Sequence, residues 1–292
     1  MNSVDFEIAL IGTGILGKSI GKKLLFDKYK LGVWNRTYKK CEELIDEGAQ
    51  RIESIEEITD NFKVIITVLK DGESTRKIIK RIPNIEDKVI IQMGTVGGLE
   101  STSIEKLIKN KGGYYLEAPV LGSVNEALNG KLIIMIGGEQ KVFNKYKFIF
   151  KSLSENFLFL GDVSKAASAK LSLNFLIASL TYSFSIVLRY LEGKNINIEN
   201  YMSLLRGSSV YAKTFDKKMV QMINNNHSKA NFNIANLTKD IDLFTSEVKE
   251  LDIDPSIIEE LNLFLSSHKK FDIGNFDYSS LHLLTKKIIS LY

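Results

Sequence analysis

A glycine-rich turn near the N-terminus constrains the fold of this chain more than any other feature. The apolar run FEIALI, residues 6–11, leads directly into Gly12, Gly14 and Gly17, spaced as G-x-G-x-x-G, and a stretch of helical period follows over residues 15–28. A strand that enters a helix through this spacing uses the first glycine for a tight turn, the second for close backbone approach to a pyrophosphate and the third for helix–strand packing. A helix N-terminus also attracts phosphate groups. We therefore predict a dinucleotide site, with a merely structural turn as the alternative. Its residues are Gly12, Thr13, Gly14, Ile15, Leu16 and Gly17.

Apolar runs of strand length alternate with amphipathic stretches over the first 160 residues. The runs lie at 6–11, 31–34, 64–69, 88–93, 114–120, 131–137 and 156–161, and the helical stretches include 15–28, 38–48 and 100–111. Strands that alternate with helices indicate a parallel sheet covered on both faces. The sequence therefore predicts an α/β Rossmann-type doubly wound sheet.

After Gly161 the pattern changes to helices alone. Helices are expected at 164–192, 197–206, 214–225, 234–251, 255–268 and 278–290. The fifth begins at Asp254-Pro255, because proline is favoured in a first helical turn. We predict a Rossmann-type domain over 1–162 and an all-α substrate and oligomerisation domain over 163–292, joined by a long interdomain helix at about 164–192. Since no flexible linker separates them, we expect close packing with a cleft between them.

Charge and cysteine content exclude several classes of function. The net charge is only +4, and the lysine pairs are scattered among acidic residues, which argues against nucleic-acid binding. A single cysteine, Cys41, excludes an intrachain disulfide and argues against a thiolate metal site. His227, His268 and His282 lie far apart and show no ligand spacing. We therefore expect no metal ion.

The apolar segment 171–188 bears on localisation and assembly. It carries no charge, but its seven Ser, Thr, Tyr and Asn residues favour a buried helix over a membrane span. Asp5 and Glu7 interrupt the N-terminus, so we expect no signal peptide and a cytoplasmic protein. Because the apolar length exceeds what one facing domain could cover, a homodimer or homotetramer is expected.

The residues after the second strand bear on the type of dinucleotide. An NAD site usually places an acid there for the ribose 2′-hydroxyl, whereas this chain has Asn35, Arg36 and Thr37. A guanidinium can bind a 2′-phosphate with two hydrogen bonds, which predicts NADP over NAD unless Arg36 is an ordinary loop arginine. In a doubly wound sheet the loops after the strands meet at one crevice. That geometry places Leu69 and Lys70 near the adenosine and pyrophosphate, and Thr95 near the nicotinamide ribose.

Two polar residues share one face of the long apolar helix. Lys170 and Asn174 are four residues apart. A desolvated lysine can act as the proton donor in reduction of a carbonyl group, and Asn174 could donate a hydrogen bond to the same oxygen or hold the lysine. The alternative is a lysine that snorkels to the surface at an exposed helix start. Spacing alone leaves the two interpretations equal.

Four sequence blocks resemble the β-hydroxyacid dehydrogenase family, which includes 3-hydroxyisobutyrate dehydrogenase, tartronate semialdehyde reductase and glyoxylate/succinic semialdehyde reductase. They are IGTGILGKSI with NRT, MGTVGG, LEAPVLGSVNEALNGKLIIMIGG and GDVSKAASAKLSLNF, with a weaker fifth block, FNIANLTKDIDL. The resemblance implies that Lys170 is catalytic, with Asn174 in support. It also implies that Thr95 lies on the nicotinamide side and that Lys239, followed by Asp240, contacts the cofactor.

The substrate loop departs from the pattern of that family. The family usually has D/E-A-P-V-S-G-G/S, and its serine grips the substrate carboxylate. Here Leu121 stands in place of the serine, followed by Gly122 and Ser123. Leucine cannot form a hydrogen bond through its side chain, whereas Gly122 and Ser123 could still offer N–H groups and one hydroxyl. We therefore expect the reaction type to persist and the substrate to be bulkier or less charged.

The favoured function is an NADPH-dependent reductase of a small aldehyde or keto acid, reversible as a hydroxyacid dehydrogenase, with Lys170 as general acid and base. One alternative is an imine reductase of similar architecture, and these enzymes commonly lack a lysine at this position. The other is a non-catalytic NADP-binding module. Lys170 argues against the imine reductase, which Leu121 keeps open, and the Lys170 and Asn174 pair argues against the module.

Overall fold

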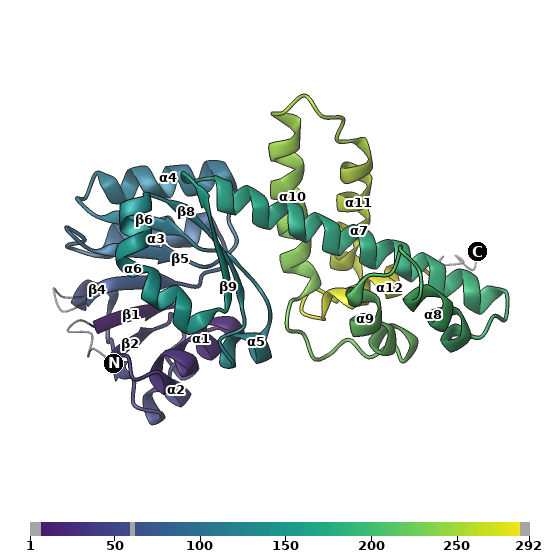
Figure 1. The fold of residues 1–292 in the computed structure, drawn as a ribbon, viewed down its shortest axis with the longest axis horizontal. Coiled ribbons are helices and arrows are strands. Elements are labelled where there is room, and N and C mark those ends of the chain that lie inside the picture. The colour runs from purple at the N-terminus through teal and green to yellow at the C-terminus, as the bar shows by residue number, and fades with distance from the viewer. Residues whose placement is uncertain (1–6, 59–61, 287–292) are drawn as a thin grey trace. The chain divides into compact units, whose positions relative to one another are not determined.

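The computed structural model describes residues 7–58 and 62–286 (Figure 1). The chain divides into two compact units, Met1–Leu171 (unit 1) and Ser172–Tyr292 (unit 2). The functional boundary expected after residue 162 stays a prediction.

Unit 1 contains one sheet, which has nine strands over the described residues. The strands are β1 (Glu7–Ile11), β2 (Leu31–Trp34), β3 (Gln50–Arg51), β4 (Phe62–Thr67), β5 (Val89–Gln92), β6 (Tyr114–Glu117), β7 (Val120–Leu121), β8 (Ile133–Gly138) and β9 (Asn156–Gly161). The first six run parallel in the order β3-β2-β1-β4-β5-β6. In this doubly wound order the winding reverses between β1 and β4, and ligands of such sheets bind outside the carboxyl ends of the strands at this reversal point. The predicted α/β class is confirmed.

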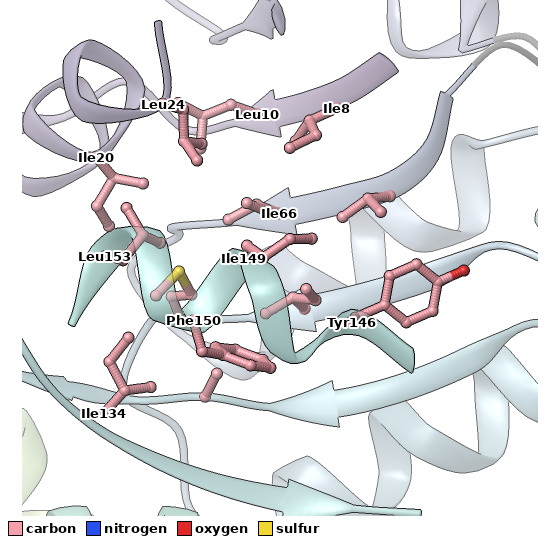
Figure 2. Close-up of a cluster of buried hydrophobic side chains, with 14 of the residues drawn as sticks. Ile8, Leu10, Ile20, Leu24, Ile66, Ile134, Tyr146, Ile149, Phe150 and Leu153 are labelled. Carbon is pink, nitrogen blue, oxygen red and sulfur yellow. The ribbon is translucent and has the colours of Figure 1, made fainter. Parts of the chain in front are cut away.

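Helices cover both faces of this sheet because alternate strand residues point to opposite sides. Ile8 and Leu10 of β1 belong to one apolar core, and Ala9 and Ile11 belong to the other. The helices of this unit are α1 (Ile15–Phe26), α2 (Glu42–Asp46), α3 (Gly72–Arg81), α4 (Gly98–Lys109), α5 (Val124–Leu128) and α6 (Gln140–Leu153), with short 3₁₀ turns η1 (Tyr38–Lys40) and η2 (Ile55–Glu57). Figure 2 shows the first core, in which strand residues pack against side chains of α1 and α6. The second core is covered by α3 and α4.

Beyond β6 the sheet departs from the all-parallel arrangement that the sequence predicts. The expected strand 114–120 is interrupted at Pro119, which has no N–H to donate to a neighbouring strand. The chain then returns through β7 and the five-residue helix α5, too short to cover the sheet as a crossover helix. As a result β8 pairs antiparallel with both β6 and β7, and only β9 is again parallel to β8.

Unit 2 is helical throughout its described part, as expected. Its elements are α7 (Lys165–Gly193, which begins in unit 1), α8 (Ile198–Arg206), α9 (Lys213–Ile223), α10 (Ile234–Lys249), α11 (Ser256–Ser266), η3 (Ser267–Phe271), η4 (Tyr278–Ser280) and α12 (Leu281–Leu284). One apolar core joins Ala178, Phe184 and Leu188 of α7 to Ile241 of α10 and Leu265 of α11. Along α7 the buried residues Ala178, Thr181, Ser185 and Leu188 recur every three or four positions, so the helix buries one face of its apolar length.

Two expected helices are shorter in the structure. The stretch 38–48 forms only η1 and α2, with Cys41 between them. The stretch 278–290 forms η4 and α12, which ends at Leu284, and residues 287–290 lie outside the described part of the chain. In both places the structure forms only one or two helical turns of the expected length, because an amphipathic period alone does not determine where a helix ends.

Among the described residues, α7 is the one helix that is long and apolar enough to cross a membrane, with a mean hydropathy of 1.7 over its best window. Only 39% of that window is buried within the protein, and Leu176, Ile186 and Tyr190 are exposed. A single such helix is weak support for a membrane span, because a core helix of a soluble protein has the same composition.

Candidate dinucleotide and acid–base site

The three glycines between β1 and α1 differ in their surroundings. Gly12 adopts a φ of +97°, and a Cβ there would come within 2.4 Å of the Val68 carbonyl oxygen. A Cβ on Gly17 would lie 1.9 Å from the Gly12 carbonyl oxygen. Gly14 is exposed, and a Cβ there would have no atom within 4 Å. Gly12 and Gly17 therefore permit the turn and its packing, whereas Gly14 leaves room for a ligand to approach the backbone.

The N-terminus of α1 is open to an anion. Gly14 is the N-cap, no side chain caps the helix, and its first turn contains no acidic residue. The N–H groups of this turn and the positive end of the helix dipole therefore suit a pyrophosphate. The residues beside Gly14 differ in exposure: Thr13 is buried, Ile15 is 57% exposed and Leu16 is half-buried.

Asn35 connects the glycine loop to the loop after β2. Its Oδ1 accepts the backbone N–H of Thr13 at 3.3 Å, and its Nδ2 donates to the Thr37 carbonyl oxygen at 3.0 Å. The hydroxyl of Thr13 also lies 3.4 Å from Cys41 Sγ. The structure thus brings together two loops that the sequence placed in one crevice.

A cavity of about 220 Å³ lies beside these loops, at the ends of β2 and β3, and three arginines line it. Arg51 stacks on the Tyr38 ring at 4.0 Å from its centroid and pairs with Glu53 at 2.6 Å. Arg81 binds the Glu56 carboxylate through two nitrogens, at 2.9 and 3.2 Å. Arg36 is exposed and has no ion pair among the described residues. Of the three, Arg36 is the guanidinium available for a phosphate.

The loops after β4 and β5 are also in contact. A Cβ on Gly94 would come within 2.3 Å of the Leu69 carbonyl oxygen, so only glycine allows this approach. The buried Gln92 donates to the Gly94 carbonyl oxygen at 3.1 Å and accepts the Thr67 hydroxyl. These bonds hold the end of β4, which leads to Lys70, beside the end of β5, which leads to Thr95. Lys70 is exposed, and Thr95 is half-buried.

The substrate loop does not offer all the donors that the sequence suggested. Ser123 is the N-cap of α5, and Glu126 Oε2 accepts both its backbone N–H, at 2.7 Å, and its hydroxyl, at 2.5 Å. This reciprocal capping box occupies both donor groups of Ser123. The expectation that Ser123 has a free N–H and hydroxyl for substrate is therefore wrong. Leu121 is half-buried and Gly122 is exposed.

Lys170 and Asn174 lie one turn apart on α7, and both are buried. Lys170 is 7% exposed, so the alternative of a snorkelling surface lysine is wrong. In unit 2, Asn174 Nδ2 donates to Asp240 Oδ2 at 2.6 Å, and Lys239 Nζ lies 2.8 Å from Asp240 Oδ1. Because a carboxylate only accepts, Asp240 fixes the amide orientation and leaves Asn174 Oδ1 as a buried acceptor, without a hydrogen-bond partner among the described residues.

Sequence reasoning gave no role to three polar side chains that hold candidate site residues in place. Asp240 was noted only as the neighbour of Lys239, on what looks like an ordinary charged helix face. Gln92 was detectable only as a polar residue that ends an otherwise apolar strand. Glu126 had a clear signal, because Ser123 and Glu126 have the S-x-x-E spacing of a capping box.

Comparison with known proteins agrees with this geometry. The family model described as the NAD binding domain of 6-phosphogluconate dehydrogenase matches residues 7–161, which include all of β1 to β9. Glyoxylate/succinic semialdehyde reductase 1 of Arabidopsis thaliana is 28% identical over 280 residues, which cover 94% of this chain and 96% of that protein. Cytokine-like nuclear factor N-PAC of Drosophila pseudoobscura pseudoobscura is 24% identical over 97% of this chain, which spans only 47% of that longer protein.

Solved structures share the fold. The 3-hydroxyisobutyrate dehydrogenase of Mycobacterium tuberculosis, solved with L-serine, aligns with a TM-score of 0.86 and 16% identity over 97% of this chain and all of that one. An imine reductase from Pseudomonas sp. aligns with a TM-score of 0.64 and 17% identity over 97% of this chain and all of that one. The family match over more than half of the chain, the glycine loop and the sheet order lead to one assignment: this chain belongs to the β-hydroxyacid dehydrogenase family of NAD(P)-dependent oxidoreductases.

Proposed function

We propose that this protein is an NADPH-dependent reductase of a small aldehyde or keto acid, reversible as a hydroxyacid dehydrogenase. The observation that carries the proposal is Lys170, a buried ammonium group on the same helix as the buried Asn174. The similarity to a glyoxylate/succinic semialdehyde reductase supports the same class of carbonyl substrate.

The residues of unit 1 fit the cofactor. The open first turn of α1 would hold the pyrophosphate, with Gly14 allowing its approach, and Arg36 would bind a 2′-phosphate. Leu69 and Lys70 would flank the adenosine side, and Thr95 the nicotinamide ribose. When bound, NADPH supplies the hydride.

Lys170 would supply the proton. During reduction its ammonium group donates a proton to the carbonyl oxygen, and during oxidation the neutral amine takes a proton from the hydroxyl group. Burial strengthens this interaction, because a charge that develops on oxygen is stabilised more strongly away from water. Asn174, oriented by Asp240, would keep its Oδ1 as an acceptor for the ammonium group or for a substrate hydroxyl. Lys239 would contact the cofactor.

The experiment that tests this role compares Lys170→Ala with Lys165→Ala, since Lys165 is an exposed lysine on the same helix. NADPH oxidation is followed with succinic semialdehyde, glyoxylate, tartronate semialdehyde, methylglyoxal and a cyclic imine. Lys170→Ala should lose turnover by at least about a hundredfold while it still binds NADPH, and Lys165→Ala should behave as wild type. Near-normal turnover of Lys170→Ala would refute the proposed function.

NADP preference is tested at Arg36. A hydrogen bond to a charged group contributes about 1.5–3 kcal/mol, so Arg36→Ala should weaken NADPH binding roughly tenfold to a hundredfold and leave NADH binding unchanged. Arg51→Ala is the matched control, because that guanidinium is already paired with Glu53. A wild-type preference for NADH, or equal loss for both cofactors, would contradict the assignment.

The substrate is expected to carry little negative charge near the loop that contains Leu121. Leu121 has no donor, and both donors of Ser123 are bonded to the Glu126 carboxylate. Gly122 keeps only its backbone N–H as a donor. This loop therefore favours an aldehyde with an apolar or neutral substituent over one with a carboxylate.

Two other functions remain as alternatives. The likeness to an imine reductase favours reduction of a C=N bond, and oxidation of NADPH by the cyclic imine alone would select it. The other is a non-catalytic NADP-binding module, which would bind NADPH tightly and oxidise it with no substrate of the panel; one relative of this chain, N-PAC, is named a nuclear factor rather than an enzyme.

The exposed apolar side chains of α7 support a homodimer or homotetramer. Leu176, Ile186 and Tyr190 lie on the exposed side of a helix that carries no charge from 171 to 188. Exposed apolar patches of this kind are often interfaces. Light scattering of Leu176→Glu should show a smaller assembly than the wild type. The expected cytoplasmic location stays a prediction.

A further inference from the structure

A buried carboxylate outside the residues assigned above joins three elements of unit 1. Glu117 is the last residue of β6 and is fully buried. Its Oε1 accepts the backbone N–H groups of Ala166, at 2.7 Å, and Ala167, at 3.2 Å, in the first turn of α7. Its Oε2 accepts the hydroxyl of Ser101 in α4. One side chain therefore ties a strand to two helices.

No cation among the described residues pairs with this carboxylate. The N–H groups and the positive end of α7 stabilise the negative charge, but burial raises the pKa of Glu117 above its usual value, and the hydrogen bonds from Ser101 and the backbone only partly offset this. The absence of a side chain at Gly137 leaves space for the carboxylate, because a Cβ there would lie 2.4 Å from Glu117 Oε1. A buried, unpaired charge is costly, so it contributes less to stability than a neutral side chain of the same shape could.

The contact lies one helical turn before Lys170 on α7. Ala166 and Lys170 are four residues apart on α7 and therefore share one face. The turn that Glu117 holds is thus the turn directly before Lys170. The other contact reaches α4, which begins at Gly98, three residues after Thr95. Glu117 also directly precedes the segment that leads to Leu121.

We propose that Glu117 is a positioning residue for Lys170, which holds the first turn of α7 against β6 and so sets where the ammonium group lies relative to the Thr95 loop. This inference rests on the proposed acid and base role of Lys170. An anion can accept two N–H bonds at once and is attracted to the helix end, so it holds the turn more firmly than a neutral amide.

The test compares Glu117→Gln, which keeps the size and one acceptor oxygen but removes the charge, with Ser101→Ala, which removes the other bond to the same carboxylate. Glu117→Gln should lower kcat about tenfold or more with little change in NADPH affinity, whereas Ser101→Ala should keep kcat within about twofold. Glu117→Asp restores the charge on a shorter side chain, and its kcat should lie between those of Glu117→Gln and the wild type.

A second measurement does not depend on activity. Hydrogen exchange of the Ala166 and Ala167 amides should be about tenfold faster in Glu117→Gln than in the wild type, and unchanged in Ser101→Ala. Wild-type kcat in Glu117→Gln overturns the positioning role, whatever the exchange result. An equal loss of kcat in Ser101→Ala overturns it as well, because the loss would then reflect general loosening.

Failure of the proposed function is distinguishable from failure of this inference. Turnover that survives in Lys170→Ala refutes the acid and base role, and with it any need to position Lys170. In that case amide exchange still reports whether Glu117 holds α7. If exchange in Glu117→Gln is also unchanged, the contact itself is refuted.

Discussion

Acidification from pH 7 to pH 5 should destabilise unit 2 more than unit 1. All three histidines of the chain lie in unit 2 and are buried: His227, His268 and His282. Burial lowers the pKa of each, and that of His282 to about 4. His282 Nδ1 lies 2.7 Å from the Ser185 hydroxyl, so the neutral ring is held by a hydrogen bond. In unit 1, burial instead raises the pKa of Glu117.

The sign follows from which state binds more protons. The unfolded chain protonates its histidines below about pH 6.5, whereas folded His282 stays neutral down to about 4, so stability is complete above 6.5 and is lost as the pH falls through that window. For His282 alone the loss of unfolding free energy between pH 7 and pH 5 is about 2 kcal/mol. A raised carboxyl pKa has the reverse effect: the contribution of Glu117 to the stability of unit 1 falls as the pH rises above its usual pKa of about 4.5.

Two spectroscopic signals can distinguish unfolding of unit 1 from unfolding of unit 2. Trp34, the single tryptophan, lies on β2 in unit 1, so its fluorescence follows that unit, whereas far-UV circular dichroism also reports the helices of unit 2. Urea unfolding at pH 5 should show a larger downward shift of the dichroism midpoint than of the fluorescence midpoint. His282→Gln should recover about 2 kcal/mol of the acid loss. Equal shifts of both probes, or an undiminished loss in His282→Gln, would refute the reasoning.

Three further predictions concern the site. Gly17→Ala should destabilise the protein by more than about 2 kcal/mol in thermal melts, because its Cβ would lie 1.9 Å from a carbonyl oxygen. Gly14→Ala should keep the stability of the wild type and weaken NADPH binding, which fluorescence titration measures. Asp240→Asn should lower kcat about tenfold at saturating NADPH, because it can release the amide of Asn174, and since Asp240 also pairs with Lys239 the NADPH affinity should change as well; steady-state assays and titration measure the two effects separately. Leu121→Ser should raise kcat/KM for glyoxylate relative to methylglyoxal about tenfold, and an unchanged ratio in steady-state assays would place the loop away from the substrate.

Much of the architecture was predictable from local patterns. Buried parallel strands are continuous apolar runs, which is why β1, β4 and β5 were visible in the sequence. The glycine spacing was equally informative, because Gly12 and Gly17 each stand where a side chain would clash with a nearby carbonyl oxygen. The reversal at β7 and β8 was not predicted, since strand direction depends on which partner a strand meets, and an apolar run carries no sign of that.

By itself the sequence determined the fold class, the glycine loop, the missing acid beside Arg36 and the helix that carries Lys170. The tertiary structure decided the states of particular side chains: that Lys170 is buried, that Ser123 is already bonded to Glu126 and that Glu117 holds the start of α7. The physical reason is separation along the chain. Glu117 and Ala166 are 49 residues apart and Asn174 and Asp240 are 66 apart, so these hydrogen bonds exist only once the sheet and helices have packed.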